Sequence, residues 1–260
     1  WGGVSNGVQQ LLGMLFGIYL ARTLNAEDYG LVGMLAIFSG IASTIINSGF
    51  SVALTNKLDA THKDYNAVFW FSFVVSICLY IVLFFSAPLI ASFYDRQELV
   101  NLSRVIFASF LFSGMAIVPH VILFKQLQVK MQAKIDVFAL FLSGMCGVLL
   151  AFNGFAYWAL AIQSTVYVAS ASLLKWMVVS WRPSLDFSIE PLKEMFPFSV
   201  KLFLTNIFQQ VNNNVFSVLL GKLYNANVLG YYSQGNKWMT MGGSMLNNMI
   251  NSVAQPVFVQ

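Results

Sequence analysis

The side chains best placed to do chemistry in this chain are amides. Five of the six residues from 209 to 214 carry one, within a stretch that is otherwise apolar: Gln209, Gln210, Asn212, Asn213 and Asn214. An amide donates and accepts hydrogen bonds but does not titrate, so it suits the binding of a polar solute better than covalent catalysis. The amides and hydroxyl that recur at helical spacing share one face of a helix, namely Asn206, Gln210, Asn213 and Ser217. We predict that water or a polar ligand contacts this face.

A single lysine, Lys237, opens an uncharged stretch that runs to residue 260. A charge held within a bilayer is rare and usually faces a bundle interior or an aqueous path. Lys237 therefore either offers an ammonium to an anionic ligand or extends to the membrane surface. We predict a substrate path that contains eight residues: Asn206, Gln209, Gln210, Asn213, Ser217, Lys237, Asn6 and Gln10. The alternative is that such groups join helices by interhelical hydrogen bonds, worth on average about 0.6 kcal/mol each.

The sequence lacks the groups that most enzymes and ion-coupled pumps use. All ten acidic residues fall in predicted loops or at helix ends, and the chain contains no P-loop, nucleophile elbow, paired catalytic carboxylates or metal-ligand cluster. His120, beside Pro119, is expected to be a packed histidine at a helix kink, with a proton site as the alternative. We therefore expect a protein that is not an enzyme and needs no cofactor or metal.

The elements that must position these residues are membrane helices. The chain is 58% hydrophobic and only 9% charged, whereas soluble domains are roughly 25% charged. Uncharged stretches long enough to cross about 30 Å of hydrocarbon recur along it. They predict an all-α polytopic membrane protein with eight helices, centred near residues 13, 42, 80, 115, 144, 168, 209 and 245, with a break at Asn153-Gly154. The eighth is rich in asparagine, so a helix lying flat at the membrane surface is the alternative.

An internal repeat organises these helices. Residues 5 to 47 align without a gap against residues 205 to 247, and nine positions are identical where about three would match by chance. Because the period contains six helices, an even number, the two copies run parallel. We predict a six-helix bundle over 1–180, a cytoplasmic linker over 181–197, and a second bundle that starts at 198 and is truncated after about two helices. The chain opens on Trp1 and is expected to be a fragment.

Charge asymmetry predicts the orientation. Nine lysines and arginines fall in the gaps after the second, fourth and sixth predicted helices, and four fall after the first, third, fifth and seventh. Short cytoplasmic loops collect Lys and Arg, so the amino terminus is expected in the cytoplasm.

Several motifs resemble a known family. Residues 21 to 30, ARTLNAEDYG, resemble the A-R-x-L-[ST]-P-E-D-[FY]-G loop of bacterial polysaccharide flippases, the Wzx-like branch of the multidrug/oligosaccharidyl-lipid/polysaccharide (MOP) exporter superfamily. The likeness extends along the chain in family order: Asn66-Ala67-Val68-Phe69-Trp70, Tyr157-Trp158-Ala159-Leu160, Trp181-Arg182-Pro183 with Phe187-Ser188, and Gly221-Lys222-Leu223-Tyr224 through Gly230-Tyr231-Tyr232-Ser233.

The resemblance implies a MATE-like transporter of two six-helix bundles around a central cavity, bordered by helices one, two, seven and eight. It implies a bacterial inner-membrane flippase that moves undecaprenyl-diphosphate-linked oligosaccharide units from the cytoplasmic to the periplasmic leaflet for O-antigen, capsule or exopolysaccharide export. Expected partners are that lipid-linked oligosaccharide, membrane lipids and other polysaccharide assembly proteins, with no nucleic acid.

Two positions depart from the family pattern, and two other functions stay open. Ala26 replaces a common Pro, and Phe216 stands where many relatives carry Asp, which puts carboxylate-based ion coupling in doubt. A multidrug exporter of the same superfamily usually shows a membrane-embedded acid. A polymerase or ligase of glycan assembly would need a large periplasmic loop with catalytic Arg or His. Neither feature is present in the predicted topology.

Overall fold

The computed structural model describes the backbone of residues 2–47, 49–186 and 188–258, and the side chains of 5–47, 49–186 and 188–243. The regular structure of these residues is helical, which confirms the predicted all-α class. The helices are α1 (Gly2–Thr23), α2 (Ala26–Met34), α3 (Ala36–Asn47), α4 (Phe50–Asn56), α5 (His62–Tyr94), α6 (Glu98–Lys125), α7 (Val129–Phe152), α8 (Tyr157–Val178), α9 (Glu190–Leu223) and α10 (Ala226–Phe258).

The second predicted helix is divided into α2, α3 and α4. Gly49, which precedes α4, has a φ of 73°, a left-handed conformation that favours glycine. A Cβ added there would lie 2.6 Å from the carbonyl oxygen of Ser199 on α9. Helix α4 therefore begins where the backbone of α9 passes close to Gly49. The predicted break at Asn153-Gly154 is also present, between α7 and α8, and Gly154 has a φ of 80°.

Four segments of the described part are long and apolar enough to cross a membrane: Ala26–Asn56, His62–Tyr94, Glu98–Lys125 and Val129–Phe152. The remaining long helices, α1, α8, α9 and α10, are 22 to 34 residues long but more polar. They carry the amides, hydroxyls and lysines, which belong on a face that contacts protein or water rather than acyl chains.

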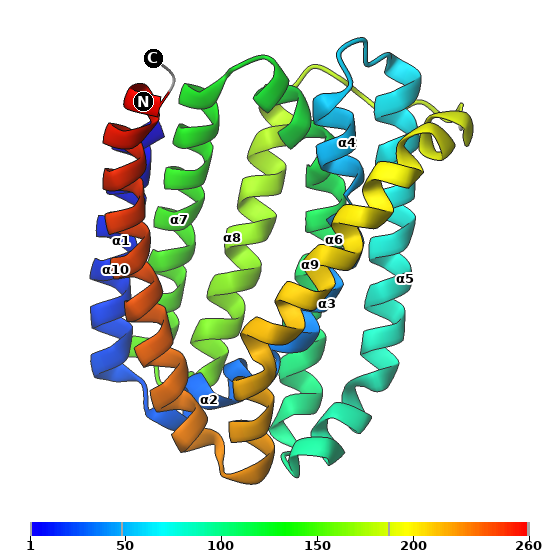
Figure 1. The fold of residues 1–260 in the computed structure, drawn as a ribbon. Coiled ribbons are helices and arrows are strands. Elements are labelled where there is room, and N and C mark those ends of the chain that lie inside the picture. The colour runs from blue at the N-terminus through cyan, green and yellow to red at the C-terminus, as the bar shows by residue number, and fades with distance from the viewer. Residues whose placement is uncertain (1, 48, 187, 259–260) are drawn as a thin grey trace.

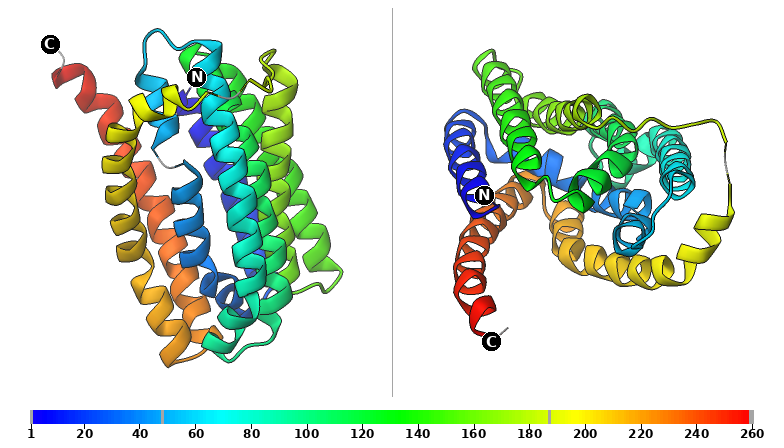
Figure 2. Two further views of the ribbon diagram at one scale, coloured as in Figure 1. Left: turned by 90° about the vertical axis from the view of Figure 1, so that its right-hand side faces the viewer. Right: turned by 90° about the horizontal axis from the view of Figure 1, so that it is seen from above.

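The helices form one bundle in which the second copy of the repeat lies across the first (Figure 1). The loops that join α4 to α5, α6 to α7 and α8 to α9 lie at one end, here called the lysine-rich end, together with the start of α1. Helix α9 runs from that end to the opposite end over α3, α4 and α5, and α10 returns from there, packed on α2 and diverging from α1 toward its C-terminal end (Figures 1 and 2). Helix α10 corresponds to the eighth predicted helix.

The repeat is visible in the helix boundaries. Helix α1 ends at Thr23 and α2 begins at Ala26, while α9 ends at Leu223 and α10 begins at Ala226, each displaced by 200 positions. One boundary differs from the sequence prediction, because α9 begins at Glu190 and residues 190–197 of the predicted linker are helical. Pro191 lies in the first turn of α9, where a missing N–H costs nothing.

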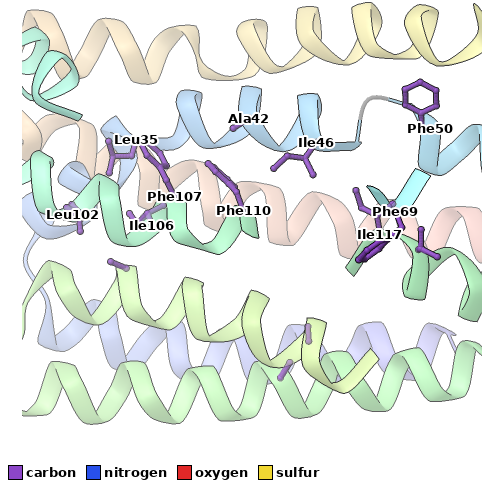
Figure 3. Close-up of a cluster of buried hydrophobic side chains, with 14 of the residues drawn as sticks. Leu35, Ala42, Ile46, Phe50, Phe69, Leu102, Ile106, Phe107, Phe110 and Ile117 are labelled. Atoms are coloured by element: carbon purple, nitrogen blue, oxygen red, sulfur yellow. The ribbon is translucent and has the colours of Figure 1, made fainter. Parts of the chain in front are cut away.

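The core of the first bundle lies between α3, α5, α6 and α8 (Figure 3). Its fully buried side chains include Leu35, Ile46, Leu102 and Phe107. Large apolar side chains also cover the outer surface, and Phe85, Leu89 and Phe152 are each more than 70% exposed. Such a surface would aggregate in water but is suited to contact with lipid.

The connection between α8 and α9 is fixed to α5 at the lysine-rich end. Trp70 Nε1 donates to the Ser184 carbonyl at 2.7 Å, and the Ser184 N–H donates to Asn66 Oδ1 at 2.9 Å. Trp181 Nε1 donates to His62 Nδ1 at 3.0 Å. Several motif residues that the sequence resemblance singled out therefore anchor a loop, and they hold the start of the second copy against the first.

Candidate functional site

The site is built around a crossing of α2 and α10 at the end opposite the lysine-rich end. A Cβ added to Gly30 would lie 1.8 Å from the carbonyl oxygen of Ala226, and one added to Gly230 would lie 1.7 Å from that of Ala26. The four residues are equivalent pairs of the repeat, so the contact is reciprocal about a pseudo-two-fold axis. Small residues four apart allow helices to approach to backbone contact. The crossing joins the two copies tightly at this end.

Residues near the axis face their own equivalents. A Cβ added to Gly33 would lie 2.7 Å from Ser233 Oγ, and 33 and 233 are equivalent positions of the repeat. The repeat is visible in the sequence, but this contact was not predicted from it. The signal was present, because both copies contain Ala and Gly four residues apart, Ala26 with Gly30 and Ala226 with Gly230.

Equivalent asparagines start the two crossing helices. The Asn25 N–H donates to Asp28 Oδ2 at 2.9 Å, as part of a capping box. The Val228 N–H donates to Asn225 Oδ1 at 2.9 Å. An N-cap residue satisfies a backbone N–H that the helix leaves without a partner. These caps hold each turn so that the first residues of α2 and α10 meet.

A polar cavity of about 370 Å³, here called the central cavity, adjoins the crossing. It is lined from both copies of the repeat: by α2 and α3, by Leu160 of α8, and by α9 and α10. Three residues predicted for the substrate path line it, namely Asn213, Ser217 and Lys237. Residues from separate helices, distant in sequence, thus contribute amide, hydroxyl and ammonium groups to one space.

Lys237 contributes a positive charge to the central cavity. Its Nζ lies 3.7 Å from where a Cβ would stand on Gly17 of α1, beside the ring of Trp238. Lys237 makes no ion pair or hydrogen bond with any residue whose side chain is described. An ammonium in this position is available to an anionic ligand.

Six further polar residues line the cavity and were not among the predicted path residues: Tyr29, Asn214, Tyr232, Ser233, Gln234 and Asn236. The Tyr29 hydroxyl is buried and faces Gln234 without a hydrogen bond of normal geometry. A buried hydroxyl that lacks a partner is satisfied by water or ligand. Periodicity could not identify Tyr29, because a tyrosine near a helix end is equally typical of an interfacial anchor.

The other predicted path residues lie outside the central cavity. Gln210 packs one turn away against α3, where Gly40 leaves room for its amide, and it accepts a hydrogen bond from Asn214 Nδ2 at 3.2 Å. Asn206 and Gln209 are exposed farther along α9. Asn6 is exposed and Gln10 half-buried on α1. The structure thus groups three of the eight predicted residues in one cavity and spreads the rest along α1 and α9.

Ion pairs link the second copy to the first at both ends. Lys57 Nζ lies 2.6 Å from Glu194 Oε2 and 3.0 Å from Asp64 Oδ1 at the lysine-rich end, and these carboxylates raise the pKa of Lys57. Lys222 Nζ lies 3.0 Å from Asp95 Oδ2 at the opposite end. The Lys57–Glu194 and Lys222–Asp95 pairs, whose carboxylates are exposed, are each worth about 0–1 kcal/mol, so they position α9 without locking it.

Comparison with known families gives one match over most of the chain. Residues 19–260 match the family described as polysaccharide biosynthesis protein. The match includes the second copy of the repeat, the first copy from residue 19 onward, the α2–α10 crossing and the central cavity.

Several characterised relatives share this similarity. The chain is 28% identical over 84% of its length to the teichuronic acid biosynthesis protein TuaB of Bacillus subtilis, covering 46% of that protein. It is 20% identical to the lipopolysaccharide biosynthesis protein WzxC of Escherichia coli, over the whole chain and 53% of that protein. It is 21% identical over 93% of its length to the succinoglycan biosynthesis transport protein ExoT of Rhizobium meliloti, covering 49% of that protein. The chain spans about half the length of these relatives.

A solved structure has the same fold. It is a multidrug resistance MATE family transporter of the MOP superfamily in an inward-facing conformation. The two structures superpose with a TM-score of 0.62 at 19% identity, over 90% of this chain and 58% of the transporter. At this identity the likeness shows the fold alone, and it confirms the predicted MATE-like architecture.

Proposed function

Because this chain belongs to the polysaccharide biosynthesis protein family, we propose that it forms part of a flippase for lipid-linked oligosaccharides. Its cargo is an undecaprenyl-diphosphate-linked oligosaccharide unit, which crosses from the cytoplasmic to the periplasmic leaflet of a bacterial inner membrane. The protein works by alternating access and forms no covalent bond with the cargo. The unit then serves surface polysaccharide assembly.

The observation that carries this proposal is the central cavity. It places an ammonium without a described partner among amides and hydroxyls of the second copy of the repeat, and the first copy adds the Tyr29 hydroxyl. Hydroxyl-rich sugars exchange hydrogen bonds with amides, and a diphosphate is attracted to a cation. The apolar outer faces of the helices leave the polyprenyl tail in the lipid while the head group enters the cavity.

The sign of the charge favours this cargo over a cationic drug. Lys237 repels cations, and the described residues that line the cavity include no carboxylate to attract one. A low local dielectric strengthens such repulsion. A multidrug exporter of organic cations would need the opposite charge in this place.

The proposed orientation follows from the two ends of the molecule. The loops with most of the lysines and arginines face the cytoplasm, by the positive-inside rule. The α2–α10 crossing then closes the periplasmic side. Alternating access requires that this crossing separate when the cavity opens outward.

The test uses the full-length protein in a strain whose own flippase gene is deleted. Lys237→Ala and Asn213→Leu are each expected to lower surface polysaccharide about tenfold, because each removes hydrogen bonds to the head group, a loss on the order of 1.4 kcal/mol. Asn212→Leu is the matched control, since Asn212 is exposed on the same stretch and does not line the cavity. Membrane protein levels are measured by immunoblot for every variant.

Full restoration of surface polysaccharide by both Lys237→Ala and Asn213→Leu, at normal protein levels, would remove the central cavity from the transport path. An Asn212→Leu variant as impaired as Asn213→Leu would show that any apolar replacement on α9 is harmful and would count equally against a specific site.

A further inference from the structure

A second polar cavity, here called the bundle cavity, lies within the first bundle near the lysine-rich end. Its volume is about 330 Å³, within the range of small-molecule sites, roughly 300–1,000 Å³. Polar groups from four helices line it, from α3, α4, α6 and α8: Asn47, Ser51, Ser113, His120, Tyr167 and Lys175. It shares no residue with the central cavity. The first copy of the repeat therefore holds a polar space of its own.

A proline and a tryptophan fix two walls of the bundle cavity. Pro119 of α6 has no N–H, so the Met115 carbonyl one turn earlier has no partner within the helix. Trp176 Nε1 of α8 donates to that carbonyl at 3.0 Å. This bond joins α6 to α8 next to the lining residues His120 and Lys175. The two basic side chains are thus held at a defined separation.

Lys175 is largely buried, yet no described carboxylate lies within hydrogen-bond distance of its ammonium group. Its side chain is 14% exposed, and its only described ion-pair partner is Asp136 of α7, with Nζ and Oδ1 3.9 Å apart. The Lys57–Glu194 and Lys222–Asp95 pairs close to 2.6 and 3.0 Å. At 3.9 Å there is no hydrogen bond, so the donors of Lys175 remain open to a ligand in the cavity. A buried ammonium without a hydrogen-bonded carboxylate is stabilised by an anion beside it.

His120 offers a second donor to the same space. Gln132 Nε2 lies 3.2 Å from the His120 carbonyl oxygen and 3.4 Å from Nδ1. When Nδ1 accepts from Gln132, the ring proton is on Nε2, where it serves as a hydrogen-bond donor. His120 follows Pro119 within α6 but is exposed rather than packed as expected, and it lies at the cavity wall.

We propose that the bundle cavity binds a carboxylate-bearing sugar residue of the cargo, with the carboxylate on Lys175 and His120. This inference rests on the proposed function. A single carboxylate fits better than a diphosphate, because Asp136 offsets the charge of Lys175 and repels a group with several negative charges. The hydroxyls of Ser113 and Tyr167 and the amide of Asn47 suit the hydroxyl groups of a sugar ring. The protein would thus select acidic oligosaccharides at the end where the cargo enters.

The test measures ligand binding to the purified full-length protein by titration calorimetry. The probes are glucuronate, its neutral isostere glucuronamide, and inorganic pyrophosphate. Glucuronate is expected to bind about tenfold more tightly than glucuronamide, the effect of one charge-assisted hydrogen bond. Lys175→Gln should abolish this difference. Asp136→Asn should tighten glucuronate binding several-fold, because it removes the competing carboxylate.

The control is Lys201→Gln, which makes the same charge change at an exposed residue outside the cavity and should leave the preference unchanged. The opposite shifts expected for Lys175→Gln and Asp136→Asn separate a binding role from a folding role, since misfolding would weaken binding in both.

Each remaining outcome is decisive. A full-length protein that restores export but does not distinguish glucuronate from glucuronamide overturns this inference and leaves the proposed function standing. Displacement of glucuronate by pyrophosphate in the wild type, lost in Lys175→Gln, identifies a diphosphate site and also overturns it. Failure of export together with glucuronate binding that depends on Lys175 supports the bundle cavity and overturns the proposed function.

Discussion

At the α2–α10 crossing the two copies of the repeat are interchangeable. Gly30 packs on the backbone of Ala226, and Gly230 packs on the backbone of Ala26, with nearly equal separations. Neither copy tolerates a larger group, because the opposing atom in each case is a carbonyl oxygen. The contact is symmetric because each glycine packs on the backbone of the equivalent alanine.

Farther along the helices the copies diverge. Gly13 and Gly17 of α1 stand where α9 carries Asn213 and Ser217. The two glycines leave room for α10, whose Met241 Cε and Lys237 Nζ approach within 3.8 and 3.7 Å of the positions of their missing Cβ atoms. One copy provides space and the other provides polar groups. Closure at the crossing uses both copies alike, whereas binding requires polar residues on one wall only.

The largest expected effect tests the symmetric contact. Gly30→Ala and Gly230→Ala each place a methyl carbon on a backbone oxygen that no side-chain rotation can move, so α2 and α10 must separate. Each should lower the free energy of unfolding by about 3 kcal/mol and abolish polysaccharide export. Thermal unfolding of the purified full-length protein and surface polysaccharide measure the two effects.

Gly235→Ala on α10 is the matched control, because nothing lies within 4 Å of its added Cβ. It should be neutral or stabilise the helix by up to about 1 kcal/mol. If Gly30→Ala and Gly230→Ala behave like Gly235→Ala, the crossing is not a tight contact. Unequal losses in the free energy of unfolding for Gly30→Ala and Gly230→Ala would show that the two copies are not equivalent at the crossing.

A smaller effect is expected near the axis, where Gly33 faces Ser233. Gly33→Ser adds a side chain 2.7 Å from the Ser233 hydroxyl, which can rotate away, so we expect a loss of about 1 kcal/mol. The exchange Gly33→Ser with Ser233→Gly should restore stability, because it reverses the roles of the two copies. A double-mutant cycle in thermal unfolding gives the coupling energy. Additive losses would mean that the two positions do not touch.

The smallest expected effect is the difference in stability between variants of the two helix caps, Asn25 and Asn225. Asn225→Ala removes the side-chain acceptor for Val228 N–H and should lower the free energy of unfolding by about 1 kcal/mol. Asn25→Ala should cost about half as much, since Asp28 still accepts from the backbone N–H of residue 25. Val228 occupies the position equivalent to Asp28, so the start of α10 lacks a side chain that could accept from the cap residue in this way. Thermal unfolding compares the two variants, and a larger loss for Asn25→Ala would contradict the expectation.

Much of the fold could be predicted from the sequence, because its determinants are local. Long apolar stretches predict the helices, and the repeat gives equal turn positions at Thr23 and Leu223. The division of the second helix at Gly49 was not predictable, since it depends on how close the Ser199 backbone comes. The start of α9 at Glu190 was missed because a proline-containing linker looks non-helical in sequence, although Pro191 is compatible with a first turn.

The candidate site was predictable only where residues share one helix face. Asn213 and Ser217 were identified by their spacing and line the central cavity. Tyr29 joins them from another helix, and helical periodicity carries no information on distances between helices. The bundle cavity was missed for the same reason, because His120 and Lys175 come together only when α6 and α8 pack.

The bond between Trp176 and the Met115 carbonyl constrains how the protein can move. Parting α6 from α8 would leave this carbonyl oxygen without its hydrogen-bond partner, at a cost of about 1–3 kcal/mol. The first bundle should therefore move as a rigid body during the transport cycle, and the bundle cavity should keep its shape. Flexing is expected instead at the contact between the two copies, where the exposed ion pairs can open and close at little cost in free energy.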